Sequence, residues 1–327
     1  MESIQFGNTD VKVTRIGLGL AALGRPGYIN LGHGKDLRED YRVQHMKEST
    51  HEVLDVAYEK GIRYFDAARS YGRAEHFLGE WLQGKNDIAV GSKWGYTYTA
   101  DWKVNAEKHE IKEHSLEVLN RQWPESLELL TSYLKIYHIH SASVESKVLD
   151  NPQVLDRLWE LKSKGVIIGL SLSGARQSAT LEKALSVTDH EGCLFQSVQV
   201  TWNMLERSTT KALQLAGKAG FGIIVKEALA NGRLTNRNTD PTFSASLSLL
   251  KGMADKYEVG IDALAIAYVL RQPWVAVVLS GAATSDQLLS NLGAMELKLE
   301  EADVHILDQL VESPDDYWRS RSQLEWN

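Results

Sequence analysis

Short apolar runs rich in β-branched and aromatic residues recur along the chain. Eight of them have the length and composition of buried β-strands: Thr14–Leu20, Arg63–Asp66, Ile88–Lys93, Leu134–His140, Val166–Ser171, Phe195–Val200, Phe221–Lys226 and Val275–Leu279. The stretches between them carry apolar residues at i, i+3 and i+4, which is the spacing of one buried helix face. The clearest predicted helices are His51–Lys60, Asn151–Gly165, Gln177–Thr188, Ser208–Ala219 and Ser285–Met295.

The end signals of one predicted helix are especially clear. Asn151 can cap it, Pro152 suits its first position, and Gly165 follows its basic last turn. Because strands alternate with helices, we expect a parallel sheet with right-handed crossovers. Eight strand–helix units predict an α/β fold, a (β/α)8 TIM barrel that forms a single domain over residues 1–327.

An open, doubly wound sheet is the alternative architecture. Its usual mark is a G-x-G-x-x-G turn between the first strand and a helix. Here Gly17-Leu-Gly19 is followed by Leu-Ala-Ala-Leu-Gly, and no helical pattern begins at that point. The sequence therefore favours the barrel.

Some segments do not fit the eightfold alternation. Gly24–Lys47 is a long polar connection after the first predicted strand, and loops of this length in compact folds often cover an active site. Glu227–Arg271 is long enough for an extra helix besides the crossover, and Leu299–Val311 predicts a C-terminal helix. The charged stretch Lys112–His114 is typical of a solvated helix face.

Composition narrows the function classes. The 327 residues include 36 Lys and Arg against 43 Asp and Glu, a formal charge of −7, which argues against nucleic-acid and membrane-surface partners. The single cysteine, Cys193, cannot form an intrachain disulfide and fits a reducing compartment. The N-terminus shows no signal-peptide pattern, and no apolar run reaches the ~20 residues of a membrane span. These features predict a cytoplasmic protein.

Polar residues stand at the ends of successive predicted strands, where parallel barrels collect their chemistry. Asp66, Lys93 and His140 end three of the runs, and Tyr71 follows Asp66 in a short loop. A nearby ammonium is expected to lower the pKa of a tyrosine, which is near 10 in isolation. Asp66 can balance Lys93, and a neutral histidine can orient a carbonyl oxygen. This set suits carbonyl reduction, with hydride delivered to carbon and a proton from Tyr71 to oxygen.

With these residues in view, the chain resembles the aldo-keto reductase family over nearly its whole length. Six segments are similar to family motifs and occur in the family's order. Tyr64–Gly72 resembles the motif of the catalytic Asp and Tyr, Gly91–Trp94 that of the Lys, and Lys135–His140 that of the His. Ile168–Ser171 and Val198–Asn203 resemble the motifs that bind the carboxamide, and Gly281–Asn291 resembles the adenosine-binding turn. The resemblance implies an NAD(P)(H)-dependent enzyme that interconverts an aldehyde or ketone, sugars included, and its alcohol.

In that family scheme Tyr71 is the general acid, Lys93 tunes it, Asp66 pairs with Lys93, and His140 orients the substrate. The resemblance also implies a set of cofactor contacts: Gly19, Leu20, Ser171, Gln199, Gly281, Thr284, Gln287 and Asn291. Two tryptophans directly follow matched motif residues and are expected to line the substrate pocket: Trp94 and Trp202.

The adenosine segment departs from the pattern of NADP-specific members, which carry a Lys-Ser pair and an Arg there. The corresponding stretch Gly281–Gln287 has no cation, and Asp286 would repel a 2′-phosphate. Thr284 and Ser285 still offer hydroxyls at a helix start. The expected cofactor is therefore NADP(H) or NAD(H). Lys226 falls near the position where many members stack an aromatic ring on the nicotinamide.

Two other functions are compatible with parts of the pattern. His138 and His140 point to the same face of one strand, as in metal-dependent barrel hydrolases, but a pair falls short of the three or four ligands of a metal site, so no metal is expected. A regulatory subunit that binds nucleotide without turnover is the second alternative. The intact set of Asp66, Tyr71, Lys93 and His140 speaks against lost catalysis.

Overall fold

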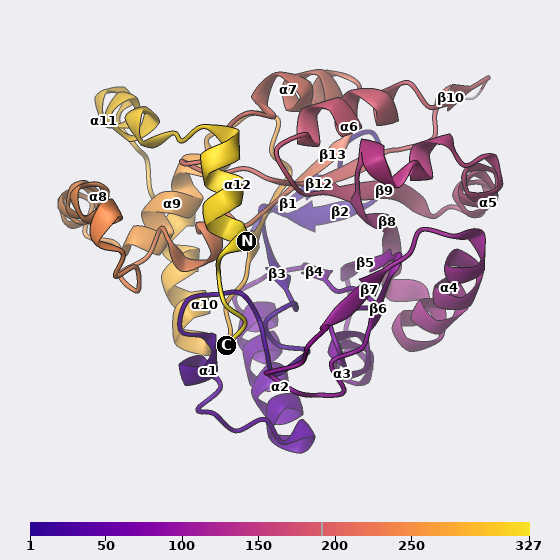
Figure 1. Ribbon diagram of the computed structural model, residues 1–327, viewed down its shortest axis with the longest axis horizontal. Helices are drawn as coiled ribbons and strands as arrows, with labels where there is room; N and C mark the ends of the chain where they lie inside the picture. Colours follow the sequence, from indigo (N-terminus) through magenta and orange to yellow (C-terminus); the bar gives the residue numbers. More distant parts are fainter. Residues whose placement is uncertain (191) are drawn as a thin grey trace.

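The computed structural model describes residues 1–190 and 192–327. Within them, eight parallel strands close into a barrel (Figure 1), and they are β3 (Ile16–Gly19), β4 (Tyr64–Asp66), β5 (Ala89–Trp94), β8 (Leu134–Ala142), β9 (Ile167–Leu172), β12 (Ser197–Thr201), β13 (Gly222–Lys226) and β14 (Val277–Ser280). Each corresponds to one of the predicted runs. The barrel closes where β14 pairs with β3, so the predicted TIM barrel is confirmed.

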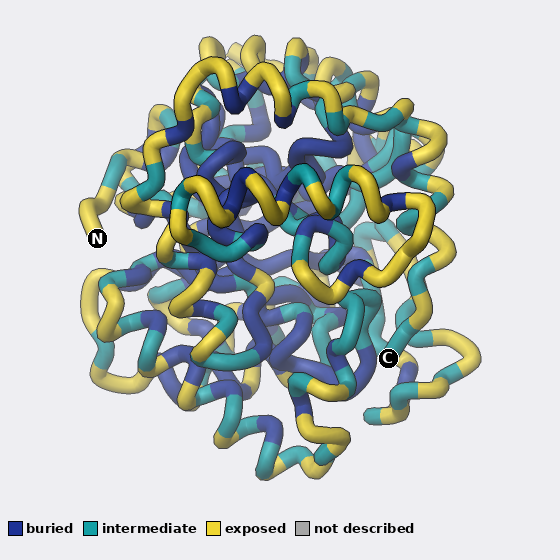
Figure 2. Tube along the Cα trace, turned by 90° about the vertical axis from the view of Figure 1, so that its left-hand side faces the viewer, coloured by how far each residue is buried: buried dark blue, intermediate teal, exposed yellow. Residues whose placement is uncertain are grey.

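Helices surround the barrel and pack their apolar faces on it. They are α2 (Val43–Glu59), α3 (Ala74–Trp81), α4 (Leu116–Leu130), α5 (Pro152–Ser163), α6 (Gln177–Leu185), α7 (Thr210–Lys218), α9 (Ile261–Leu270) and α10 (Ser285–Leu292). Buried and exposed positions alternate along them, with the buried side inward (Figure 2). The predicted cap of α5 is present, since the Asn151 side chain accepts a hydrogen bond of 3.4 Å from the Val154 amide.

Helices outside the eightfold alternation lie toward the C-terminus. They are α8 (Ser244–Lys256), which is the expected extra helix after β13, α11 (Glu301–Leu307) and α12 (Pro314–Ser322). Both α8 and α11 fall in segments predicted to hold a helix, whereas α12 was not predicted. Beyond α12 the chain returns to the segment after β3, where the Asn327 backbone exchanges two hydrogen bonds with Tyr28, of 3.2 and 3.1 Å. A short helix, α1 (His33–Asp36), lies in that segment. Among the described residues, no helix is both long and apolar enough to cross a bilayer.

The N-terminal end of the barrel is covered by a hairpin that the sequence did not predict. Its strands are β1 (Ser3–Gln5) and β2 (Lys12–Thr14). The fully buried Phe6 packs on Tyr64 inside the barrel, with ring centroids 6.4 Å apart. Gly222 makes room for that ring, because a Cβ at this position would lie 2.4 Å from it. The predicted strand Thr14–Leu20 is divided between the end of β2 and β3, and the Thr14 hydroxyl donates to the Ile16 carbonyl at 2.7 Å across the break.

The connection after β5 carries a second hairpin, β6 (Tyr96–Tyr98) and β7 (Glu110–Lys112). The expectation of a solvated helix face at Lys112–His114 is therefore wrong. Lys112 donates to the Ser141 carbonyl at 2.7 Å, and His114 Nε2 lies 2.8 Å from the His140 carbonyl oxygen. The hairpin and the residues just after it thus contact the C-terminal end of β8, at the predicted catalytic histidine and its neighbour. A third small hairpin, β10 (Thr188–Asp189) with β11 (Gly192–Cys193), follows α6.

Candidate active site

A buried ion pair lies at the C-terminal ends of β4 and β5. Lys93 Nζ contacts Asp66 Oδ2 and donates to the Ala67 carbonyl at 2.8 Å. The other Asp66 oxygen accepts from Gln199 Nε2 at 2.8 Å and from the Tyr64 hydroxyl at 3.2 Å. Both charged side chains are at most 2% exposed. The carboxylate is thus fully engaged, and it balances the ammonium charge.

Tyr71 and His140 lie beside this pair. The Tyr71 ring centroid is 4.9 Å from Lys93 Nζ, and its ring meets the His140 ring edge to face at a centroid distance of 5.5 Å. The Ser70 hydroxyl lies 3.4 Å from His140 Nδ1. The fold thus brings together all the side chains that the sequence analysis selected for proton transfer.

The electrostatics of this group differ from expectation in one respect. We expected Lys93 to lower the pKa of Tyr71, but burial raises it, with a further contribution from Asp66 and opposition from Arg25. Burial and the nearby Lys93 hold the pKa of His140 well below its usual value. At neutral pH the phenol therefore keeps its proton and the imidazole is uncharged.

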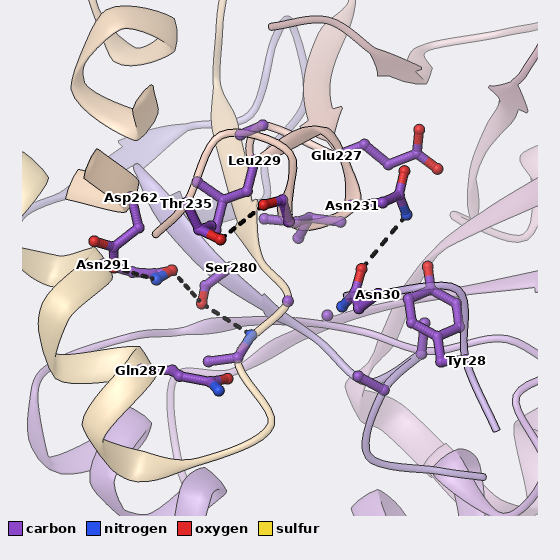
Figure 3. Close-up of a pocket in the computed structure, with 18 of the residues that line it drawn as sticks. Tyr28, Asn30, Glu227, Leu229, Asn231, Thr235, Asp262, Ser280, Gln287 and Asn291 are labelled. Atoms are coloured by element: carbon purple, nitrogen blue, oxygen red, sulfur yellow. Dashed lines mark hydrogen bonds between the residues drawn. The ribbon is translucent and has the colours of Figure 1, made fainter. Parts of the chain in front are cut away.

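A cavity of about 410 Å³ extends from this group toward α10 (Figure 3). Asp66 and Tyr71 line one end of it. Several of the expected cofactor contacts also line it: Gly19, Gln199, Gly281, Gln287 and Asn291. At the far end Asn291 donates to Asp262 at 3.2 Å. The cavity therefore connects the proton-transfer group with the predicted adenosine segment in one continuous space.

Three of the expected cofactor contacts lie outside the cavity lining. The Leu20 side chain is fully buried. Ser171 Oγ accepts a hydrogen bond of 2.8 Å from the Ser141 amide, and Thr284 caps α10 by accepting from the Gln287 amide at 3.3 Å. Ser171 and Thr284 thus support the backbone around the cavity, and their contacts with a nucleotide stay predictions.

The two tryptophans expected in the substrate pocket lie elsewhere. Trp94 is fully buried, with its ring 5.7 Å from that of His114. Trp202 is 1% exposed, stacks on Tyr268 and donates from Nε1 to the Thr210 hydroxyl at 2.9 Å. The physical reason is the alternation of strand side chains. Trp94 follows the inward-pointing Lys93, so it points outward to the helices.

Arg25 belongs to the site and was missed. Its side chain is almost fully buried, and its guanidinium carbon lies 5.2 Å from the centroid of the Tyr71 ring and 4.8 Å from that of Trp326. It donates to Glu110 at 3.0 Å and to the Ser70 carbonyl at 3.1 Å. Its position inside the long Gly24–Lys47 segment was the only available signal.

The segments after β3 and β13 meet over the cavity. Asp36 and Arg237 form a two-point ion pair with oxygen–nitrogen distances of 2.6 Å each. The Leu31 amide donates to the Asn231 carbonyl at 3.1 Å, and the Asn231 side chain lies 3.4 Å from that of Asn30 (Figure 3). These contacts form a bridge, and they place part of the Gly24–Lys47 segment in the cavity wall as expected.

The histidine pair considered for a metal has two different environments. His138 Nε2 bonds to the Ser197 hydroxyl at 2.9 Å, and the ring fills space left by Gly169, where a Cβ would come within 2.3 Å of it. His140 instead faces Tyr71. No group of three or more potential metal-ligating side chains is found in residues 1–190 and 192–327.

Comparisons with known proteins agree with this geometry. The profile of the Aldo/keto reductase family matches residues 15–312. The oxidoreductase YqkF of Bacillus subtilis is 24% identical, with 94% of this chain and 95% of the relative covered. The NADH-specific methylglyoxal reductase of Escherichia coli is 24% identical, with 96% and 99% covered.

Among solved structures, the holo form of aldo-keto reductase AKR11C1 from Bacillus halodurans has the same fold. Its TM-score is 0.73 at 22% identity, and 96% of this chain and 97% of that chain are covered. The barrel, the converging polar side chains and the family match over most of the chain lead to one conclusion. The chain belongs to the aldo-keto reductase family of NAD(P)-dependent oxidoreductases.

Proposed function

We propose that this enzyme transfers hydride between a nicotinamide cofactor and a small carbonyl compound, with Tyr71 as the general acid. The observation that carries the proposal is the convergence of Tyr71, Lys93, Asp66 and His140 at one end of the cavity. Burial raises the pKa of Tyr71, so the phenol carries its proton at neutral pH and is available as the donor.

The residues along the cavity fit a dinucleotide. Its wall includes small residues at Ala228, Gly232 and Gly281, and a Cβ at Gly281 would meet nothing within 4 Å. Gln199 offers an amide at the catalytic end, and Gln287 and Asn291 offer amides at the other. When bound, the reduced nicotinamide supplies the hydride for the carbonyl carbon.

The protein side chains divide the remaining work. Tyr71 donates its proton to the carbonyl oxygen as negative charge develops there. Lys93, held by Asp66, stabilises the phenolate that this transfer leaves behind. The uncharged His140 hydrogen-bonds the same oxygen and orients the carbonyl. Alcohol oxidation uses the same groups in reverse.

We further propose NAD(H) as the preferred nucleotide. Asp262 and Asp286 line the cavity beside α10, and neither has an ion-pair partner in the part of the chain that the structure describes. Arg237 also lines the cavity, but Asp36 occupies its guanidinium. A 2′-phosphate at this end would meet carboxylates and no free cation. The relative from Escherichia coli is described as NADH-specific, which is in line with this preference.

The Tyr71→Phe variant tests the proposal. We expect turnover of aldehydes to fall by roughly 10²–10⁴-fold, because general acid catalysis contributes about that much. Nucleotide affinity, followed through quenching of the 9 tryptophans, should stay near the wild-type value. Tyr58→Phe is the matched control, since its hydroxyl is far from the site and bonds only weakly, at 3.5 Å, to the Asn86 carbonyl.

Unchanged turnover in Tyr71→Phe would refute the assigned acid. Tight nucleotide binding by the wild type without turnover on a broad carbonyl panel would instead favour the regulatory-subunit alternative. Failure to bind either nucleotide would remove the basis for the proposal.

A further inference from the structure

Lys226 is a buried cation that the proposed chemistry does not use. It ends β13, in register with Thr201 on β12, and it lines the cavity together with Asp66, Tyr71 and Gln199. Its side chain is only 16% exposed. Lys226 also contributes to the lowered pKa of His140, which places its charge near the proposed proton-transfer group.

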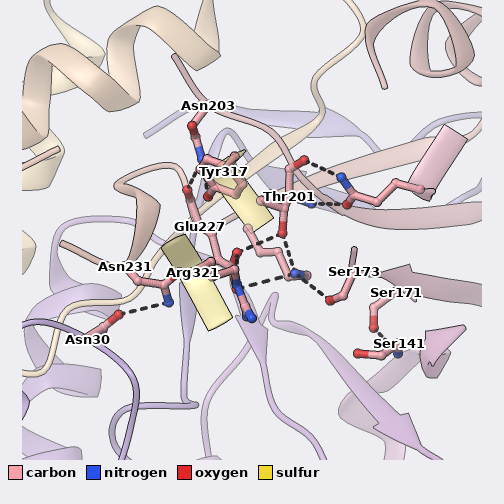
Figure 4. A network of polar contacts seen from close by, with 12 residues as sticks. Asn30, Ser141, Ser171, Ser173, Thr201, Asn203, Glu227, Asn231, Tyr317 and Arg321 are labelled. Carbon is pink, nitrogen blue, oxygen red and sulfur yellow. Dashed lines mark hydrogen bonds and ion pairs between the residues drawn. The ribbon is translucent and has the colours of Figure 1, made fainter. Parts of the chain in front are cut away.

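The ammonium of Lys226 has two hydroxyl partners, on Thr201 and Ser173, and lies near the Glu227 carboxylate, three residues labelled in Figure 4. It donates to the Thr201 hydroxyl at 2.6 Å and to the Ser173 hydroxyl at 3.3 Å. Its nearest carboxylate oxygen, on Glu227, is 3.7 Å away, beyond hydrogen-bond distance. Two neutral hydroxyls therefore hold a group that has a third proton to give.

Glu227 forms its closest ion pair with Arg321 rather than with Lys226. Arg321, from α12, donates from Nε to both carboxylate oxygens at 2.9 and 3.1 Å (Figure 4), and the Thr201 hydroxyl donates at 3.0 Å. Burial alone would raise the pKa of Glu227, but Arg321 and Lys226 lower it to about 2, so it is ionised. One carboxylate thus stands between two cations, and this cluster keeps one excess positive charge.

The other charges around this end of the cavity do not cancel that excess. Asp66 forms an ion pair with Lys93, and Glu110 forms one with Arg25. A buried ammonium that shares its one carboxylate with a guanidinium is only partly neutralised, and an anion that arrives with the ligand recovers part of the cost of burying it. A lysine ammonium binds either a carboxylate or a phosphate as a point charge. The position of Lys226 in the same cavity lining as Asp66 and Tyr71 favours an anionic group carried by the carbonyl substrate.

We propose that Lys226 binds a carboxylate of the substrate, so that the enzyme acts on carbonyl compounds that carry a carboxylic acid group. This rests on the proposed function, because the acid group is assigned to the same end of the cavity as Tyr71. Lys226 is then the residue that determines substrate specificity, and Thr201 and Ser173 orient its ammonium.

Matched acid and amide substrates separate charge recognition from shape. The pairs are 4-carboxybenzaldehyde with 4-formylbenzamide, and succinic semialdehyde with 4-oxobutanamide. We expect wild type to favour the acid of at least one pair in kcat/KM. Lys226→Met and Lys226→Gln should lower kcat/KM for that acid about ten- to a hundredfold, mainly through KM, and change the amide little. Lys226→Arg should restore part of the preference, and the exposed Lys218→Met is the control.

The pH dependence gives a second readout. Burial lowers the pKa of Lys226 to about 8, opposed by Glu227 and assisted by Arg321 and Lys93. The KM for the acid should therefore rise as the pH increases through about 8, while the KM of the amide should not follow. In Lys226→Met and Lys226→Gln this difference between acid and amide should disappear.

The outcomes distinguish this inference from the proposed function. If wild type turns over acids and amides equally and the Lys226 variants do the same, the inference is wrong and the reductase proposal stands. If wild type reduces no carbonyl, the proposed function fails, and benzoate against benzamide binding, followed by tryptophan fluorescence, decides the anion site. Loss of benzoate affinity in Lys226→Met supports the site, and equal affinity overturns it.

Discussion

The buried pair of Lys93 and Asp66 gives the most direct test of the energetics at the site. Asp66→Asn keeps the shape of the side chain but removes the charge that Lys93 contacts. The ammonium, at most 1% exposed, would keep only neutral partners, the Ala67 carbonyl and at best the amide oxygen of the new side chain. Breaking a buried pair from one side costs about 3–5 kcal/mol. We expect a loss of that size in the free energy of unfolding.

We expect the effects of the two substitutions on the free energy of unfolding to be strongly coupled. Lys93→Met alone leaves Asp66 buried with only the neutral donors of Gln199 and Tyr64, so it should also destabilise the fold. The double variant removes both charges, and such replacements are often nearly neutral. Its loss should therefore be smaller than the sum of the single losses by at least about 2 kcal/mol.

Urea denaturation of wild type, both single variants and the double variant measures this coupling, and it needs neither cofactor nor substrate. Circular dichroism and tryptophan fluorescence should give the same transition midpoints. Additive losses within about 0.5 kcal/mol would refute the account, because independent sites add in that way. The result would then mean that water or a neighbouring group satisfies Lys93 when Asp66 is gone.

Three further expectations follow from other parts of the chain. Gln287→Arg should increase the affinity for NADP(H) relative to NAD(H) in fluorescence titrations, while the exposed Gln83→Arg changes neither; no change in Gln287→Arg would show that the adenosine end has been misplaced. Glu227 has a folded-state pKa of about 2, below its unfolded value, so it contributes stability that is present above about pH 4.5 and is lost as the pH falls toward 2. Acid unfolding curves of Glu227→Gln should therefore be flatter than wild type over that range, and identical curves would contradict the assignment. Phe6→Ala should cost about 3–5 kcal/mol in the free energy of unfolding by emptying the closed end of the barrel, yet leave nucleotide affinity unchanged when folded.

Periodicity was sufficient for the barrel because each strand is buried on both faces. Such strands appear as short continuous apolar runs, and the chain carries one run for each barrel strand. The same logic located Asp66, Lys93 and His140, since each polar residue ends an apolar run at the mouth. The N-terminal hairpin escaped notice because its strands are only three residues long and half-exposed.

Side-chain direction and long-range contacts were harder to predict. Trp94 was expected in the pocket because it is adjacent to Lys93, yet adjacent strand residues point to opposite sides. Arg25 meets Trp326 across most of the length of the chain, and Arg321 meets Glu227 at a separation of 94 residues. No local pattern encodes such pairings. The balance that sets the pKa of Tyr71 depends on them and on burial, so its direction could not be derived from neighbours in sequence.

The bridge between Asp36 and Arg237 has a consequence for the timing of the reaction. We expect a nucleotide that fills the cavity beneath it to leave faster once the two-point ion pair and the backbone contact of Leu31 with Asn231 have opened. The pair is partly exposed, so added salt weakens it. We expect nucleotide dissociation to accelerate with ionic strength. At low salt, release of the oxidised nucleotide rather than hydride transfer would then be the rate-limiting step of turnover.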